Sequence, residues 1–216
     1  MPNGLHRAYP NIINYEGVLG NEMNKFGKNV TTEHRATIPF TRMLGGPMDF
    51  TPGSMRNAVG NNFVVRNTLP FTQGTRCNEM ALFVVYFESL KMLSDATTEY
   101  AKEPEVFGFL LQIPTSWDDS KVLEAKVSDY LVIARKKGDT WYIGGINDES
   151  DVREFNISLN FLDGGKSYKA QIYADGVNTD KIGTEYKYSE QDVNQKSSVK
   201  IKMNKGGGCI IRLSVK

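Results

Sequence analysis

The sequence has few of the residues that most metal and disulfide sites require. Among 216 residues it contains two cysteines, Cys77 and Cys209, and two histidines, His6 and His34. The cysteines are far apart, and neither belongs to a Cys-x-x-Cys or Cys/His cluster, so we expect small buried apolar residues rather than zinc ligands. An all-histidine metal site is also excluded. Any metal would therefore be a hard cation bound by carboxylates.

Charge of one sign and long apolar runs are lacking as well. Lys and Arg number 26 against 25 Asp and Glu, so the formal net charge is +1. No global field attracts nucleic acid, anionic lipid or a strongly acidic substrate. No run approaches the ~20 apolar residues that cross a bilayer, and no basic segment followed by an apolar one opens the chain. We expect neither nucleic acid nor membrane as a partner, and 40% hydrophobic residues predict a globular chain with a sizeable core.

The first half, residues 1–122, alternates short apolar runs with helical patterns. "NIINY" (11–15) predicts a buried strand, and residues 37–53 predict a helical start followed by a short strand. Residues 75–95 predict a helix whose "LKMLSD" end is compatible with another strand, and residues 103–114 predict a helix. Strands and helices that alternate at these lengths are typical of parallel α/β units.

The second half, residues 123–216, changes to the period of antiparallel strands. Val199, Ile201 and Met203 alternate with polar residues, which indicates a half-buried strand. This half is predicted to be a small β-sandwich without helices. Three segments each predict a pair of strands around a turn: 129–148, 154–176 and 197–216.

Two carboxylates lie six positions apart in "NYEGVLGNE", Glu16 and Glu22. If "NIINY" is a parallel strand, they leave its carboxyl end, where α/β folds assemble their sites. Glycosidic bond cleavage needs one protonated carboxyl and one carboxylate on the opposite side of the sugar. Two loop carboxylates can equally share a calcium ion or remain solvated surface groups, and the spacing does not decide among these alternatives.

Further polar residues are candidates for substrate contacts. Glu33 and His34 form a cluster before an apolar run, and Asp49 stands at a predicted strand end. A hydrogen-bonded surface pair and a turn cap are the corresponding structural interpretations. Trp117, in "TSWDDS", fits either a sugar-stacking platform or a packed turn between the two halves. Phosphate-binding loops and the Gly-x-Ser-x-Gly elbow do not occur.

Four ordered stretches carry a family resemblance. "GLHRAYPNIINYEGVLGNE", "EHRATIPFTRMLGGPMDFTPGSM", "FVVYFESLKMLSD" and "IPTSWDDSKVL" resemble the C-terminal part of glycoside hydrolase family 97. The best known members are bacterial α-glucosidases and α-galactosidases of gut Bacteroidetes. The resemblance is dense from residue 4 to about 145 and weaker beyond. It implies α/β plus all-β architecture: about the last three βα units of a (β/α)8 barrel, followed by an antiparallel β-sandwich.

The resemblance also implies roles for the two glutamates. Glu22 stands at the position of the general acid and contacts a catalytic calcium ion, and Glu16 stands at a calcium ligand. Glu33, His34 and Asp49 remain weaker candidates for substrate binding. The expected partner is an oligosaccharide or another α-glycoside. Family members are usually periplasmic, although no signal for that location occurs in this chain.

The family pattern predicts that several functional groups lie outside this chain. The base of inverting members lies just upstream of residue 1, and the nucleophile of retaining members lies further upstream. A barrel that lacks five of its eight strands has open edges, so we expect the chain to be inactive alone and to need the N-terminal part of the same enzyme. The alternative is a non-catalytic carbohydrate-binding or structural module that uses Trp117 and Phe50.

Overall fold

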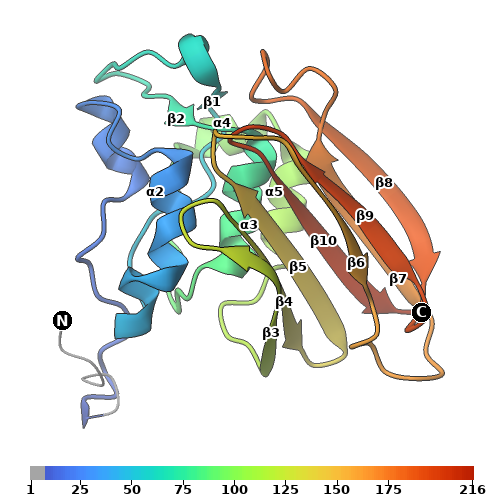
Figure 1. The fold of residues 1–216 in the computed structure, drawn as a ribbon. Coiled ribbons are helices and arrows are strands. Elements are labelled where there is room, and N and C mark those ends of the chain that lie inside the picture. The colour runs from blue at the N-terminus through green and yellow to red at the C-terminus, as the bar shows by residue number, and fades with distance from the viewer. Residues whose placement is uncertain (1–7) are drawn as a thin grey trace.

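The computed structural model, which describes residues 8–216, places a helical and irregular part before a part built of antiparallel strands (Figure 1). His6, one of the two histidines, lies outside the described residues. The helices are η1 (Asn21–Lys25), α2 (Thr32–Thr37), η2 (Ile38–Phe40), η3 (Arg42–Gly45), η4 (Gly60–Asn62), α3 (Arg76–Val85), α4 (Thr97–Ala101) and α5 (Pro104–Leu110), where η denotes a 3-10 helix.

Helix α3 is the central helix of the described chain, and all of its residues are buried. It begins at the N-cap Thr75, whose hydroxyl accepts a hydrogen bond from Asn78 N at 3.1 Å. Helix α5 begins at Pro104, which suits a first helical turn. The predicted helices at 75 and 103 are thus confirmed. From residue 8 onward, no helix is long and apolar enough to cross a membrane.

The first half forms less regular parallel structure than predicted. Tyr15 and Met48 form an isolated parallel bridge, and Met48 N donates to Phe87 O at 3.1 Å, so the chain at residues 15, 48 and 87 lies side by side. The prediction of a strand at 11–15 is nevertheless wrong, and the "LKMLSD" segment, residues 90–95, forms no strand either. Each segment meets its neighbour through one or two hydrogen bonds, which do not make a ladder. A barrel portion therefore stays a prediction.

One short parallel pair does form in this half. Strand β1 (Asn57–Ala58) pairs with β2 (Thr72–Gln73), and both strands are fully buried. Neither strand was predicted, because two residues are too short to show a period.

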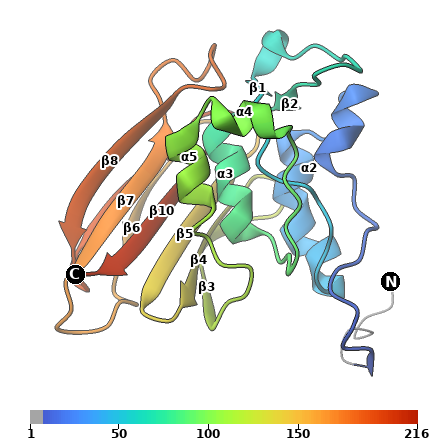
Figure 2. The same cartoon turned by 180° about the vertical axis from the view of Figure 1, so that it is seen from behind.

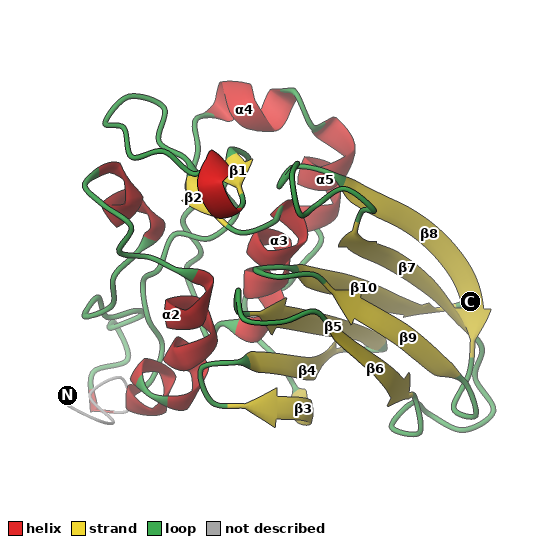
Figure 3. Cartoon of the chain, turned by 45° about the horizontal axis from the view of Figure 1, so that its top comes forward, coloured by secondary structure: helices red, strands yellow, loops and turns green. Residues whose placement is uncertain are grey.

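The second half is a β-sandwich of two antiparallel sheets (Figure 3). The six-stranded sheet has the order β3-β4-β5-β10-β7-β8, and the second sheet is the pair β6-β9. The predicted sandwich is thus confirmed. The strands are β3 (Asp119–Lys126), β4 (Tyr130–Lys137), β5 (Thr140–Asn147), β6 (Arg153–Ser158), β7 (Tyr168–Asp175), β8 (Tyr186–Val193), β9 (Ser198–Met203) and β10 (Gly208–Val215).

Strand pairing confirms one of the three predicted hairpins. β4 and β5 pair directly across Gly138, which has φ +56°. The other two predictions are wrong, because β6 pairs with β9 and β10 lies between β5 and β7. The turns at 163–165 and 206–208 therefore carry the chain from one sheet to the other. Strand β3 begins before the predicted domain boundary at residue 122, and that boundary stays a prediction.

The six-stranded sheet is covered on both faces. Alternate residues of β4 face opposite ways: Leu131 and Ile133 join the core around α3, whereas Val132 and Ala134 join the core beneath β6 and β9. Figures 1 and 2 show α3 and α5 on one face of the sheet and the pair β6-β9 on the other. This two-sided cover explains why β4, β5 and β10 are almost continuously buried. As predicted, residues 123–216 contain no helix, and the helices that cover one face of the sheet belong to the first half.

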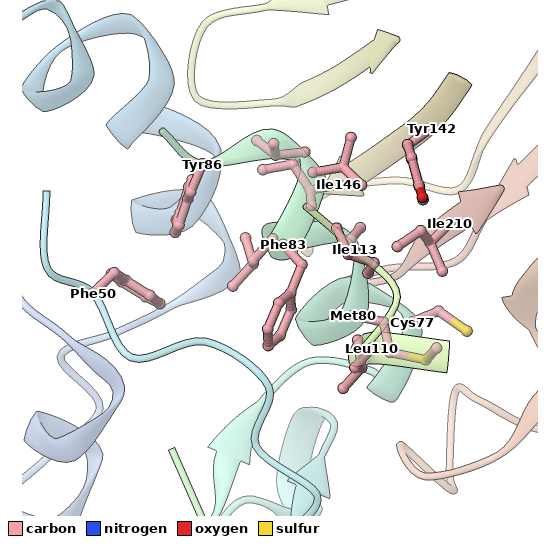
Figure 4. Close-up of a cluster of buried hydrophobic side chains, with 14 of the residues drawn as sticks. Phe50, Cys77, Met80, Phe83, Tyr86, Leu110, Ile113, Tyr142, Ile146 and Ile210 are labelled. Atoms are coloured by element: carbon pink, nitrogen blue, oxygen red, sulfur yellow. The ribbon is translucent and has the colours of Figure 1, made fainter. Parts of the chain in front are cut away.

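The core around α3 extends to the irregular segments of the first half. Figure 4 shows Phe50 and Tyr86 on one side of α3, and Ile146 and Ile210 of the sheet on the other. The rings of Phe50 and Tyr86 meet edge to face, with centroids 4.8 Å apart. Because Phe50 is fully buried, the loop that follows it is anchored in the core.

Candidate functional site

Glu22 lies in the first turn of η1, with its side chain exposed. Its Oε2 is 3.1 Å from the Thr51 hydroxyl. Gly20 makes this approach possible, since a Cβ at residue 20 would lie 2.4 Å from Glu22 Oε2 and 2.6 Å from Phe50 O. The turn that carries Glu22 is therefore closely seated on the loop at Phe50 and Thr51.

Glu16 is held by its backbone, and its carboxylate is exposed. Arg42 donates to Glu16 O from Nε at 3.2 Å and from Nη2 at 2.8 Å. The same guanidinium donates to Tyr15 O at 2.7 Å and to Gly46 O at 3.1 Å. Arg42 thus fixes the segment beside the Tyr15–Met48 bridge, and burial lowers the pKa of its guanidinium.

Within residues 8–216, neither His34 nor Glu33 forms a hydrogen bond with the Glu22 carboxylate, whose partner is Thr51. His34 Nε2 is 3.2 Å from Leu19 O, and burial lowers the pKa of the imidazole. The ring borders a hollow of about 470 Å³ that Arg42 also lines. Glu33 is exposed in the first turn of α2 and borders a separate hollow with Asp148. Their role in substrate binding stays a prediction.

Asp49 follows the Tyr15–Met48 bridge directly. Its backbone N donates to Tyr15 O at 3.0 Å, so this residue continues the parallel contact. Its Oδ1 is buried without a hydrogen-bond partner. Such a group is compatible with a polar ligand or a water molecule at this position.

Two buried glutamates hold the loop of residues 50–54, and the sequence analysis missed both. Glu88 Oε1 accepts from Phe50 N at 2.6 Å, and burial raises the pKa of this carboxyl to about 7. Glu79 Oε2 accepts from Gly53 N at 2.9 Å and Ser54 N at 3.1 Å. Burial also raises the pKa of Glu79. The signal for Glu79 was its place in a helix with no polar face, where a carboxylate must be paired.

The partner of Glu79 is the fully buried Arg35 of α2. Arg35 Nη1 lies 2.5 Å from Glu79 Oε1, and both side chains have no exposed surface. Asn21 donates from Nδ2 to Glu79 Oε2 at 2.9 Å and to Thr51 O at 3.1 Å. This network therefore connects α2, α3, the loop at residues 50–54 and the residue next to Glu22.

Carboxylates suit a calcium ion, but the described residues do not form a complete site for it. Within residues 8–216, no three or more His, Cys, Asp or Glu side chains are grouped so that they could hold a metal. Calcium takes six to eight oxygen ligands. Glu16 and Glu22 have the right chemistry to contribute two of them, and the remaining ligands would come from other parts of a larger protein or from water.

The two residues proposed for a sugar-stacking surface differ in burial. Phe50 is fully buried. Trp117 packs against the core, where its ring meets that of Tyr142 at a centroid distance of 5.5 Å. Phe50 therefore offers no surface for stacking, and only part of Trp117 is exposed.

Comparison with known sequences gives two informative relatives. The chain is 42% identical over 214 residues to a retaining α-galactosidase of Bacteroides thetaiotaomicron, and the matched region covers 98% of this chain and 32% of the relative. It is 34% identical over 146 residues to a probable retaining α-galactosidase of Streptomyces bingchenggensis, covering 67% of this chain and 21% of the relative. The chain thus spans about a third or less of the length of these relatives.

A family model and solved structures agree with these relatives. Residues 116–214 match the model described as the glycosyl-hydrolase 97 C-terminal domain, oligomerisation. A family 97 glycoside hydrolase from Pseudoalteromonas sp. strain K8, in complex with panose, superposes with a TM-score of 0.90 at 35% identity, covering 100% of this chain and 34% of that one. The same strain's enzyme in complex with acarbose gives a TM-score of 0.90 at 36% identity.

Proposed function

The chain belongs to glycoside hydrolase family 97, whose members it matches over their C-terminal portion, and from this premise we propose that it is the C-terminal part of an exo-acting retaining α-galactosidase. The observation that carries the proposal is the 42% identity to a retaining α-galactosidase over 98% of the chain. By the complete enzyme we mean this chain joined to the segment that precedes it in family members.

The proposed mechanism uses Glu22 as the general acid. Its Oε–H bond breaks as the proton passes to the glycosidic oxygen, and the C–O bond breaks with its electron pair going to that oxygen. A carboxylate on the preceding segment attacks the anomeric carbon and forms the glycosyl-enzyme intermediate. Glu22, now a carboxylate, then takes a proton from the water that releases the sugar. Two observations support this role: Glu22 is exposed, and its carboxylate contacts Thr51 in the loop that Phe50 anchors in the core.

Calcium is part of the proposal. We assign Glu16 and Glu22 as two of its ligands, on the basis of the family resemblance and of their oxygen chemistry. A bound calcium ion would supply positive charge at the sugar. We also propose a periplasmic location, which rests on the family alone.

We propose galactose rather than glucose as the sugar that the complete enzyme releases. The relative with 42% identity is a retaining α-galactosidase and the one with 34% is named a probable retaining α-galactosidase, whereas the Pseudoalteromonas structures that hold panose and acarbose show 35% and 36%. A non-catalytic carbohydrate-binding module is less well supported, since Phe50 is buried and Trp117 is packed.

The test is hydrolysis of p-nitrophenyl α-galactoside and α-glucoside in the presence of calcium. The chain is assayed alone and together with the preceding segment. We expect no turnover by the chain alone and faster turnover of the α-galactoside by the combination. Absence of activity in both cases would overturn the proposed function, and preference for the α-glucoside would overturn the assignment to galactose.

A further inference from the structure

Thr51 has a backbone conformation that its side chain disfavours. Its φ is +69°, in the left-handed region that β-branched residues rarely adopt. Such a conformation persists only where the surroundings hold it. The question is what holds Thr51 there and what the conformation achieves.

Two buried carboxylates hold the backbone on the two sides of Thr51. Glu88 binds Phe50 N before it, and Glu79 binds Gly53 N and Ser54 N after it. Glu79 and Glu88 are 0% and 1% exposed. Three backbone N–H groups on the two sides of Thr51 thus find buried acceptors, and these hydrogen bonds can offset the cost of the left-handed residue.

The clamped conformation directs the Thr51 hydroxyl at Glu22. Its Oγ1 lies between two acceptors, Glu22 Oε2 at 3.1 Å and the close carbonyl oxygen of Phe50. Asn21, the neighbour of Glu22, donates to Thr51 O at 3.1 Å. The turn that carries Glu22 is thus tied to Thr51 through both a side chain and a backbone atom.

We propose that Thr51 is a positioning residue for Glu22: its hydroxyl holds Oε2, so that Oε1 is the oxygen that delivers the proton to the leaving group. This inference rests on the proposed general-acid role of Glu22. As the proton leaves, Glu22 becomes a better acceptor than the Phe50 carbonyl. The hydroxyl hydrogen, shared with Phe50 O beforehand, is then donated fully to Oε2 and stabilises the carboxylate as its charge develops.

The test compares Thr51→Val with Thr51→Ser in the complete enzyme. Valine keeps the β-branched shape and removes the hydroxyl, whereas serine keeps the hydroxyl. For an α-galactoside with a sugar leaving group we expect Thr51→Val to lower kcat about tenfold with little change in KM. For a dinitrophenyl α-galactoside, which needs little protonation, we expect a loss below about twofold. Thr51→Ser should remain within about twofold of the wild type on both substrates.

A purely structural role would lower both activities together and would not be rescued by serine. Equal losses on the two substrates, no loss, or a Thr51→Ser variant as impaired as Thr51→Val would each overturn the inference. If Thr51→Val does not fold, Thr51→Gly provides the same comparison, because it removes the hydroxyl and relaxes the backbone. Glu22→Gln is measured alongside. If Glu22→Gln loses the same activity on both substrates, the proposed function fails. If Glu22→Gln loses more on the substrate with the sugar leaving group but Thr51→Val does not, only this inference fails.

Discussion

The backbone and the side chain of Glu16 have different roles in this account. Its carbonyl oxygen accepts hydrogen bonds from Arg42, and its carboxylate is exposed. We expect Glu16→Gln to weaken calcium binding to the complete enzyme at least about tenfold, because an amide oxygen replaces a charged ligand. Calorimetric titration with calcium measures this, with the exposed Glu105→Gln as the matched control. A calcium titration unchanged by Glu16→Gln would refute the role of Glu16.

Glu88 predicts a pH dependence of stability. Burial raises its pKa from 4.5 to about 7, with Phe50 N, Lys91 and Asp49 as its neighbours. Between these two values the folded chain keeps a proton that the unfolded chain has lost, so the free energy of unfolding falls as pH rises across this window. The shift corresponds to roughly 3 kcal/mol.

Glu88→Gln should remove most of this fall, since glutamine can still accept from Phe50 N and no longer ionises. Urea unfolding at pH 5 and pH 8 measures it: the change in unfolding free energy between the two pH values should be smaller in Glu88→Gln by up to about 3 kcal/mol. Equal pH dependence in the two proteins would show that Glu88 is not a buried, readily protonated carboxyl.

Helix α3 and the six-stranded sheet depend on close approach at Gly144. A Cβ there would lie 2.8 Å from Val84 Cβ and 2.9 Å from Ala81 O, so strand β5 cannot carry a side chain at this point without moving the helix. We expect Gly144→Ala to lower the free energy of unfolding by about 1–3 kcal/mol. Gly108→Ala is the control, because nothing lies within 4 Å of its Cβ position in α5 and alanine favours helix. If the two substitutions had equal effects in urea unfolding, the close packing of α3 on β5 would be contradicted.

Local signals predicted the elements that depend on local contacts. The helix that begins at Arg76, the helix that begins at Pro104 and the alternation in β9 each depend on signals within a few residues, and each was predicted. The partners of β6 and β10 were missed, because these strands pair with residues 35 to 72 positions away in the sequence. A hydrophobic period does not specify such partners.

The candidate site was predictable to a similar extent. Glu22 was identified from a motif, whereas Glu79 and Glu88 appeared as charges within apolar segments and were not recognised as supports of the site. These two glutamates support the site because they accept hydrogen bonds from backbone N–H groups of the loop at residues 50–54, which is remote from them in sequence. Only the folded chain brings these groups together.

Residues 8–216 form two packed cores and carry an exposed candidate acid, Glu22. The sandwich and α3 form a continuous packed structure, which is consistent with a TM-score of 0.90 to the family 97 enzyme over the entire chain. Glu22, the proposed acid, is exposed, and its hydrogen-bond partner among the described residues is Thr51 and not a second carboxylate. We infer that this chain supplies the acid and that the preceding segment supplies the nucleophile.

The most direct test of this account is the leaving-group dependence of Glu22→Gln in the complete enzyme. A general acid contributes about 10²–10⁴-fold where the leaving group needs a proton. We predict that kcat/KM for an α-galactoside with a sugar leaving group falls at least about 100-fold, while that for a dinitrophenyl α-galactoside falls less than about tenfold. An equal fall on both substrates would contradict the assignment of Glu22 as the general acid.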